Sequence, residues 1–341
     1  MKIGLMDVDA WARGGKVTFP NLALMKLSAW HKARGDAVEW IPYGFHDHYD
    51  RAYLSKVFSD EYSADYPYPI DADEVIRAGS GYAITVENGV EVYHKDADPP
   101  LPAEIEHIYP DYSIYPQFPN TAYGFLTRGC PRGCQFCHVA GMQGRRSHRV
   151  ASLDEFWHGQ KNIVLLDANI SACPECIDIF AELASTEAYV EFNQGLDARI
   201  MTTEKIRALN RVKYRRIHFA WDKPEEDLRD DFKRIAENLE RLTRRNVSCY
   251  VLTNFGSSHQ QDLERIMFLR ELDIQPYVMI YRKKTAPEVT RRLARWVNNP
   301  WVFWTVPSFD GYVAGMKWKN VLERQTTLFD VVDGWYQDAK E

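Results

Sequence analysis

The chain has 341 residues, of which 45% are hydrophobic and 13% aromatic, enough for one large domain or two smaller ones. A formal net charge of −6 excludes the global basic signature of nucleic-acid-binding proteins, so any contact with a polyanion would have to be local. No stretch approaches about 18 uninterrupted apolar residues, and the first residues meet an acid too soon for a secretory signal. We therefore expect no membrane span and a cytoplasmic location.

The first hundred residues predict strands that alternate with a helix. Apolar residues recur at helical spacing from Leu22 to about Gly35. Short strands are expected at 2–8, 37–41, 57–58 and 74–78. This alternation favours an open α/β sheet of Rossmann type for a domain over 1–95. The proline-rich residues 96–120 are expected to form a linker over the surface.

From residue 121 the alternation becomes regular. Six strands are expected, at 123–127, 162–166, 189–193, 217–220, 247–253 and 275–280. The helices expected between them lie at 152–159, 174–183, 204–209, 224–242 and 261–272, the first opening with a capping box at Ser152. Six units are fewer than the eight of a full barrel. The tail at 286–341 carries five tryptophans that could cover the open side of such a partial barrel: Trp296, Trp301, Trp304, Trp318 and Trp335.

The densest chemical signal is the octapeptide Cys130-Pro-Arg-Gly-Cys134-Gln-Phe-Cys137. Thiolates at this spacing select iron–sulfur clusters or zinc. A closed zinc site normally has four ligands, whereas this loop offers three, so a [4Fe–4S] cluster held here would keep one iron free of protein. A zinc site completed by His138 or a distant ligand, or three reduced core cysteines, are the alternatives.

The spacing of the three cysteines, with Phe136 directly before the third, resembles the cluster loop of radical S-adenosylmethionine (radical SAM) enzymes. The six predicted strand–helix units are similar to the partial (β/α)6 barrel of that family, over about residues 120–285. The resemblance implies that Cys130, Cys134 and Cys137 ligate a [4Fe–4S] cluster, that S-adenosylmethionine (SAM) chelates the open iron, and that a 5′-deoxyadenosyl radical attacks the substrate. It also implies an electron donor such as flavodoxin or ferredoxin.

Polar residues follow every later strand of the series, at the ends where parallel barrels collect their chemistry. A polar residue there is as often a helix cap or turn former as a functional group. The candidates for cofactor binding at these ends are Asp167, Asn169, Gln194, Asp197, Arg199, Asp222 and Asn254.

The resemblance assigns roles to part of this set. The family's Gly-Gly-Glu element, which holds the SAM amino group, is replaced by residues 165–169, so Asp167 or Asn169 would make that contact. Gln194 and Asp197 are candidates for the ribose hydroxyls, and Arg199 for the SAM carboxylate. Phe136 would pack near the adenine.

The leading domain resembles in layout the cobalamin-binding-type domain that precedes the barrel in one group of these enzymes. The family's Asp-x-His-x-x-Gly is not matched, because Trp11 stands where the cobalt-ligating histidine would be. A cobalamin-dependent methyltransferase is therefore the rival within the enzyme class. From another class, a non-catalytic zinc or iron–sulfur protein could bind nucleic acid through its basic loop.

Three further cysteines lie outside the loop. Cys173 and Cys176 form a Cys-x-x-Cys pair that could hold an auxiliary cluster, take part in redox exchange, or simply begin a helix. Cys249 is expected in the core. Basic residues gather around the cysteine loop and would favour a small-molecule or nucleotide-like anionic substrate. They are Arg128, Arg132, Arg145, Arg146, His148 and Arg149.

Overall fold

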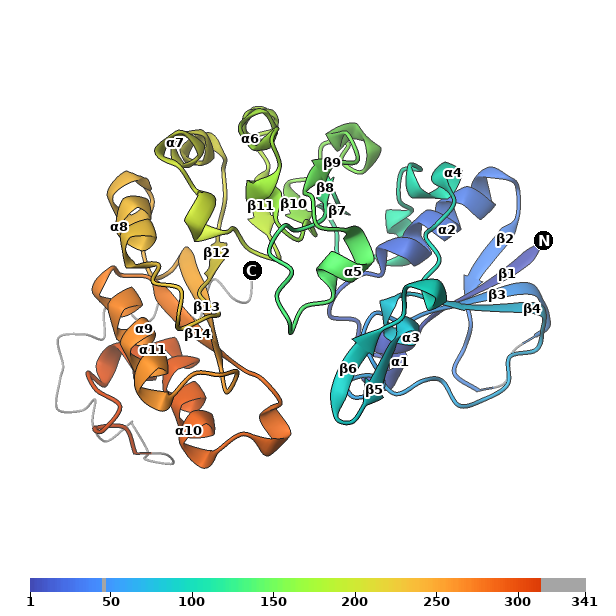
Figure 1. Cartoon of the computed structure of the whole chain (residues 1–341). Coiled ribbons are helices and arrows are strands. Elements are labelled where there is room, and N and C mark those ends of the chain that lie inside the picture. Colours follow the sequence, from blue (N-terminus) through green and yellow to red (C-terminus); the bar gives the residue numbers. More distant parts are fainter. Residues whose placement is uncertain (45–46, 314–341) are drawn as a thin grey trace, which may run out of the picture. The chain divides into compact units, whose positions relative to one another are not determined.

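The computed structural model describes residues 1–44 and 47–313, and it is an α/β structure built on parallel sheets (Figure 1). The chain forms two compact units. The first contains Met1–Ala220, Asp227–Cys249 and Glu271–Ile274. The second contains Trp221–Glu226, Tyr250–Arg270 and the described residues from 275. No helix in the described part of the chain is long and apolar enough to cross a membrane.

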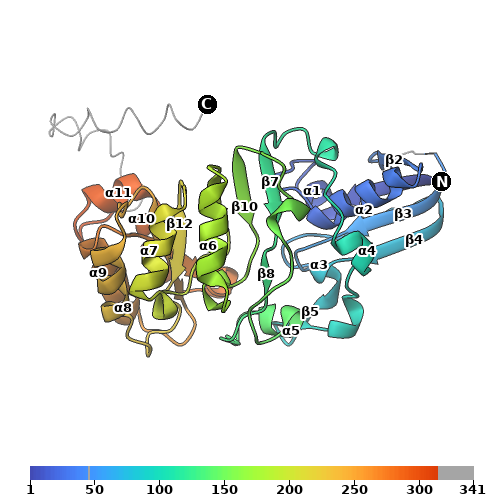
Figure 2. The ribbon, with the colours of Figure 1, turned by 90° about the horizontal axis from the view of Figure 1, so that it is seen from above.

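Four parallel strands in the order β2-β1-β3-β4 form the sheet at the start of the first unit. They are β1 (Lys2–Asp7), β2 (Ala37–Trp40), β3 (Tyr49–Ser55) and β4 (Ala72–Ala78). Helix α2 (Leu22–Ala33) lies over one face (Figure 2), and Asn21 caps it by accepting the N–H of Leu24. Because β1 is central, its side chains are buried on both faces.

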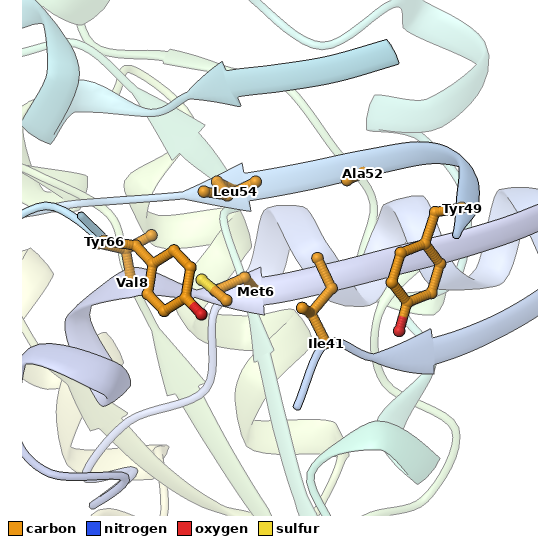
Figure 3. Packing of buried hydrophobic residues seen from close by; sticks show 7 residues of the cluster. All are labelled: Met6, Val8, Ile41, Tyr49, Ala52, Leu54 and Tyr66. Atoms are coloured by element: carbon orange, nitrogen blue, oxygen red, sulfur yellow. The ribbon is translucent and has the colours of Figure 1, made fainter. Parts of the chain in front are cut away.

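Each face of this sheet has its own hydrophobic core. Alternate residues of β1 point to opposite sides. Ile3 and Leu5 pack with Leu24 of α2. On the other face, a second cluster gathers side chains from β1, the start of α1, β3 and the residues that follow β2 and β3 (Figure 3): Met6, Val8, Ile41, Tyr49, Ala52, Leu54 and Tyr66.

The prediction of a strand at 57–58 is wrong. The third strand lies earlier, at β3, and the backbone N–H groups of Val57 and Phe58 are instead bound by the carboxylate of Asp9. The sequence reading also missed a hairpin of β5 (Ile84–Glu87) and β6 (Val90–Tyr93). Its two-residue turn, Asn88-Gly89, has positive φ at both positions, as such hairpins require.

Residues 96–120, expected to run over the surface, also contribute to the core of the first unit. The segment holds a short helix, α4 (Ala103–Glu106), whose Ile105 packs with Ile3 of β1. Further on, the buried hydroxyl of Tyr115 donates to Asp7 at 2.8 Å. The proline-rich stretch is therefore fixed to the sheet at two points.

All six strands predicted beyond residue 120 are present. β7 (Thr121–Gly124), β10 (Asn162–Leu165) and β11 (Tyr189–Phe192) form a parallel sheet in the order β11-β10-β7. Helix α6 (Cys176–Ser185) covers one face of it, with Phe180 packed edge-on against Phe192. The remaining strands are β12 (Ile217–Ala220), β13 (Val247–Thr253) and β14 (Gln275–Ile280).

Helix boundaries were predicted less well than strands. The helix expected at 152–159 is only a 3₁₀ turn at Leu153–Glu155, although its capping box between Ser152 and Glu155 is present. α8 spans Arg229–Asn238, not 224–242. Leu239 is extended at its end, and the next N–H, of Glu240, donates to Asn210 and not to the helix. α7 (Thr203–Arg211) and α9 (His259–Glu271) lie where they were expected.

The second unit ends in α10 (Glu288–Val297) and α11 (Pro300–Thr305). Trp296 is fully buried there and contacts Phe303. Trp304 donates its indole N–H to Gln275 at 2.6 Å. Two of the tryptophans expected to cover an open barrel side, Trp318 and Trp335, lie outside the described residues.

Candidate cysteine loop and strand-end site

The cysteine loop leaves the carboxyl end of β7 as a closed excursion. After β8 (Thr127–Arg128) the chain runs through the three cysteines and α5 (Val139–Gln143), and returns in β9 (His148–Arg149), which pairs antiparallel with β8. The N–H of Cys130 donates to the carbonyl of Gly144 at 3.1 Å. These bonds fix the base of the loop, and Cys134 and Cys137 lie beyond this base.

Two glycines allow the loop to turn. Gly129 has φ +92, and a Cβ there would collide with the backbone carbonyl of Arg146. Gly133 has φ +57, and a Cβ there would meet the guanidinium of Arg145. Gly129 therefore requires glycine, because its neighbour is backbone. At Gly133 the neighbour is the end of a flexible side chain, so glycine is favoured there by its positive φ.

The three loop cysteines differ from the other three in burial. Cys130 and Cys134 are half-buried and Cys137 is exposed, whereas Cys173, Cys176 and Cys249 are buried. Burial raises the pKa of Cys173, and it raises the pKa of Cys176 to about 12. A buried thiol with a raised pKa is a poor nucleophile in the absence of a metal. By burial, the accessible thiols among the six cysteines are those of the loop.

Within residues 1–44 and 47–313, no three His, Cys, Asp or Glu side chains converge closely enough to hold a metal ion. The three loop thiols are therefore not gathered around a common point in this conformation. Their chemistry still fits an iron–sulfur cluster, because they are accessible sulfur ligands within eight residues of one loop. Binding would require the tip of the loop to close around the metal.

Asp167, at the carboxyl end of β10, is engaged by the backbone. Its carboxylate accepts the N–H groups of Leu126 and Thr127 and, at 2.6 Å, the hydroxyl of Thr127. The side chain is buried, and burial raises its pKa to about 6. Asp167 thus links β10 to the strand that leads into the cysteine loop.

Asp197 holds two arginines at once. Its Oδ2 accepts from Nε of Arg132 at 2.5 Å, and its Oδ1 accepts from Nε of Arg199 at 2.6 Å. The carboxylate itself is buried, with 4% of the side chain exposed. Because Arg132 lies between the first two cysteines, Asp197 ties the cysteine loop to the segment after β11. A ribose hydroxyl could bind Asp197 only by replacing one of these ion pairs.

Asn169 contacts a loop thiol directly. Its Nδ2 lies 3.5 Å from Sγ of Cys130 and 3.5 Å from Oδ2 of Asp197. The first unit therefore brings together four predicted residues: Cys130, Asn169, Asp197 and Arg199.

The other predicted residues are less closely joined. Phe136 is half-buried in the loop and Gln194 is exposed after β11. Asp222 and Asn254 belong to the second unit, where Asp222 is half-buried and Asn254 has a φ of 62°. The Nδ2 of Asn254 donates to the carbonyl of Tyr281 at 2.8 Å, which ties the ends of β13 and β14.

Several partners of the loop were not predicted. Ser171 joins Asn169 to the backbone of Asp197, and Glu91 of the hairpin pairs with His138 at 3.6 Å, directly after the third cysteine. The only feature of the sequence that could have indicated a role for Ser171 is its position two residues after Asn169. Glu91 carries no sequence signal, because its hairpin was missed.

Half of the basic residues around the loop are neutralised by carboxylates. Arg128 pairs with Glu106 at 2.8 Å, and Arg149 pairs with Glu182 at 2.7 Å. Arg132 pairs with Asp197 as described. The exposed basic side chains are those of Arg145, Arg146 and His148.

The residue at the position of the family's cobalt-ligating histidine belongs to the core of the first unit. Trp11, at the position of the family's histidine, lies in α1 (Val8–Ala12) and packs edge-on against Tyr66 at 5.3 Å. Asp9 is buried and binds the backbone of Val57 at 2.7 Å. Both side chains thus serve the fold, and neither is a cobalt ligand of the kind the family uses.

The sequence matches no model of a known protein family, and no curated protein matches it. The assignment of a function therefore rests on the chemistry and geometry of the site.

Proposed function

We propose that this chain is a radical SAM enzyme, which cleaves SAM reductively at a [4Fe–4S] cluster to generate a 5′-deoxyadenosyl radical. The observation that carries the proposal is the three-thiol loop at the carboxyl end of β7, tied to Asn169 and Asp197 at the same ends of the neighbouring strands. We further propose that the six later strands belong to a partial (β/α)6 barrel, and that the leading sheet is Rossmann-like.

The parallel register supports this grouping. Thr121, Asn162 and Tyr189 lie side by side at the starts of β7, β10 and β11, so the carboxyl ends of these strands meet at one edge. Chemistry collects at that edge in parallel α/β proteins. The cysteine loop leaves from there, which would place a metal beside the polar residues after β10 and β11.

In this proposal Cys130, Cys134 and Cys137 hold three irons. The cluster would supply the electron that breaks a carbon–sulfur bond of SAM, chelated at the fourth iron. The residues of the chain would bind SAM and orient it. Arg199 is the candidate for the SAM carboxylate, Asp167 or Asn169 for the amino group and Phe136 for the adenine. Gln194 is a further candidate of the first unit, and Asp222 and Asn254 of the second unit are candidates by their positions after β12 and β13 alone.

The substrate is proposed as a small or nucleotide-like anion, because Arg145 and Arg146 are exposed beside the loop. An electron donor such as flavodoxin or ferredoxin, and a cytoplasmic location, belong to the same proposal.

The replacement Cys134→Ala tests the assignment after anaerobic reconstitution with iron and sulfide. Removing one of three thiol ligands is expected to abolish the cluster and the formation of 5′-deoxyadenosine from SAM. The matched control is Gln135→Ala, which changes an exposed neighbour in the same loop. Normal iron content and 5′-deoxyadenosine formation in Cys134→Ala would refute the proposal.

The non-catalytic rival is a zinc or iron–sulfur protein that binds nucleic acid. The pairing of Arg128, Arg132 and Arg149 with carboxylates leaves a smaller basic surface for it than the sequence suggested. Metal analysis separates the two: one zinc per chain and no brown chromophore would support the rival.

A further inference from the structure

We infer that Asn169 is a positioning residue for the cysteine loop: its amide donates a hydrogen bond to the sulfur of Cys130 and so sets how tightly the loop holds metal. The inference deepens the proposed function, on which the identity of the metal rests. The two side chains in contact, those of Asn169 and Cys130, lie 39 residues apart in the sequence.

The orientation of the amide is fixed by its neighbours. Oδ1 of Asn169 accepts the hydroxyl hydrogen of Ser171 at 2.7 Å, and Nδ2 faces both Cys130 and Asp197 at 3.5 Å. The flipped amide would point its carbonyl oxygen at the carboxylate of Asp197. Repulsion between two acceptors excludes that arrangement, so the N–H groups face the sulfur.

The donor is itself held in place. Asn169 is 5% exposed, and Ser171 is fully buried. The hydroxyl oxygen of Ser171 accepts the backbone N–H of Asp197 at 2.9 Å, and Nζ of Lys205 donates to the Ser171 carbonyl at 2.7 Å. These contacts hold the amide facing the sulfur of Cys130, whose backbone N–H is itself bound to Gly144 at the base of the loop.

A fixed donor favours the metal-bound form of Cys130. Metal binding converts a thiol to a thiolate, and a hydrogen bond to a charged acceptor is stronger than one to a neutral acceptor. Bonds of this kind orient ligands, and they raise the reduction potential of a cluster by stabilising its added electron. Loss of such an outer partner typically weakens metal binding by about 10- to 100-fold.

Asp197 completes the arrangement from the other side. It accepts from Nδ2 of Asn169 while it holds Arg132, two residues after Cys130. One carboxylate thus fixes both the donor and the segment that carries the acceptor. In this inference Asp197 acts through these two side chains and not through contact with the cofactor.

The test is Co²⁺ binding to the metal-free, full-length chain, followed by the thiolate-to-cobalt absorption. Asn169→Leu, of similar size but without a donor, is expected to bind Co²⁺ at least about 10-fold more weakly than wild type. Asn162→Leu is the matched control, since it changes the asparagine that begins β10, whereas Asn169 lies four residues beyond the end of that strand. Equal Co²⁺ affinity in Asn169→Leu and Asn162→Leu would overturn the inference.

A second variant and a second measurement complete the test. Ser171→Ala leaves the amide and its contact with Asp197 but removes the hydroxyl that holds Oδ1, and it is expected to weaken Co²⁺ binding in the same direction by a smaller factor. In reconstituted protein, Asn169→Leu is expected to lower the cluster potential, and an unchanged potential would count against the inference. Co²⁺ binding needs no SAM, so a chain that shows the Asn169 effect but never forms 5′-deoxyadenosine would defeat only the proposed function.

Discussion

At the scale of single residues, the carboxyl ends of β10 and β11 contain two buried carboxylates with different partners. Asp197 is compensated by two guanidinium groups, so its charge is balanced inside the protein. Asp167 accepts hydrogen bonds from Leu126 and Thr127, and burial raises its pKa to about 6. The first carboxylate connects segments by charge, and the second does so by accepting hydrogen bonds.

The raised pKa of Asp167 predicts a pH dependence of stability. Between its ordinary value of 3.8 and about 6, the folded state binds more protons than the unfolded state, so the free energy of unfolding increases as the pH falls through this range. Asp167→Asn removes this contribution. Relative to the variant, wild type is therefore expected to gain melting temperature as the pH falls from above 6 toward 3.8.

The comparison with the variant is needed because His218 works in the opposite direction. Burial lowers its pKa from 6.5 to about 4, so protonation in that range favours the unfolded state. A melting-temperature difference between wild type and Asp167→Asn that does not change with pH would contradict the prediction.

At the scale of elements, the excursion from β8 to β9 depends on its glycines. Gly129 and Gly159 have almost the same φ, +92 and +94, but only Gly129 faces a backbone carbonyl. Gly159→Ala is expected to cost about 1–2 kcal/mol of unfolding free energy from its conformation alone. Gly129→Ala should cost more, because the carbonyl of Arg146 must also move.

Denaturant unfolding and Co²⁺ titration of the two variants measure this difference. Gly129→Ala is expected to be the less stable variant and to bind Co²⁺ more weakly, whereas Gly159→Ala should bind like wild type. Equal losses in the two variants would show that the close approach at Gly129 contributes nothing.

The strands of the later series could be predicted because each is a short apolar run bounded by polar or turn residues. β3 was missed because charged residues interrupt its sequence, Tyr-Asp-Arg-Ala-Tyr-Leu-Ser, although four of its residues are buried in a row. The false strand at 57–58 is apolar, but its backbone N–H groups bind Asp9, 48 and 49 residues away. Local patterns carry no information about a partner that distant.

The same limit applies to the candidate site. The thiol spacing identified the loop, and the strand ends identified Asn169, Asp197 and Arg199 as polar residues at one edge. Which of them contact each other depends on loop paths after the strands. The pairing of Asp197 with Arg132, 65 residues apart, therefore emerged only from the structure.

At the scale of the whole molecule, the segment between the two sheets of the first unit joins the leading sheet to the strand before the cysteines. Glu106 receives Nζ of Lys26 from α2 at 3.2 Å and Nη2 of Arg128 from β8 at 2.8 Å. Lys26 is buried, and burial lowers its pKa. One carboxylate thus compensates cations from two parts of the chain.

Glu106→Gln is expected to destabilise the protein by about 1–3 kcal/mol, because it removes the carboxylate paired with the buried Lys26 and leaves only the more distant charge of Glu155. The control is Glu74→Gln, which breaks the exposed pair of Glu74 with Arg51 and should cost less than about 1 kcal/mol. Denaturant unfolding measures both. An equal loss of unfolding free energy in the two variants would mean that the carboxylate of Glu106 does not stabilise the contact between α2 and β8.

The most direct test of the proposed function is the electron paramagnetic resonance spectrum of the reduced, reconstituted protein before and after addition of SAM. If one iron of the cluster has no protein ligand, the amino and carboxylate groups of SAM would bind that iron. Addition of SAM is therefore expected to change the spectrum of the cluster. A spectrum that SAM leaves unchanged, or a protein that takes up zinc and forms no cluster, would contradict the account.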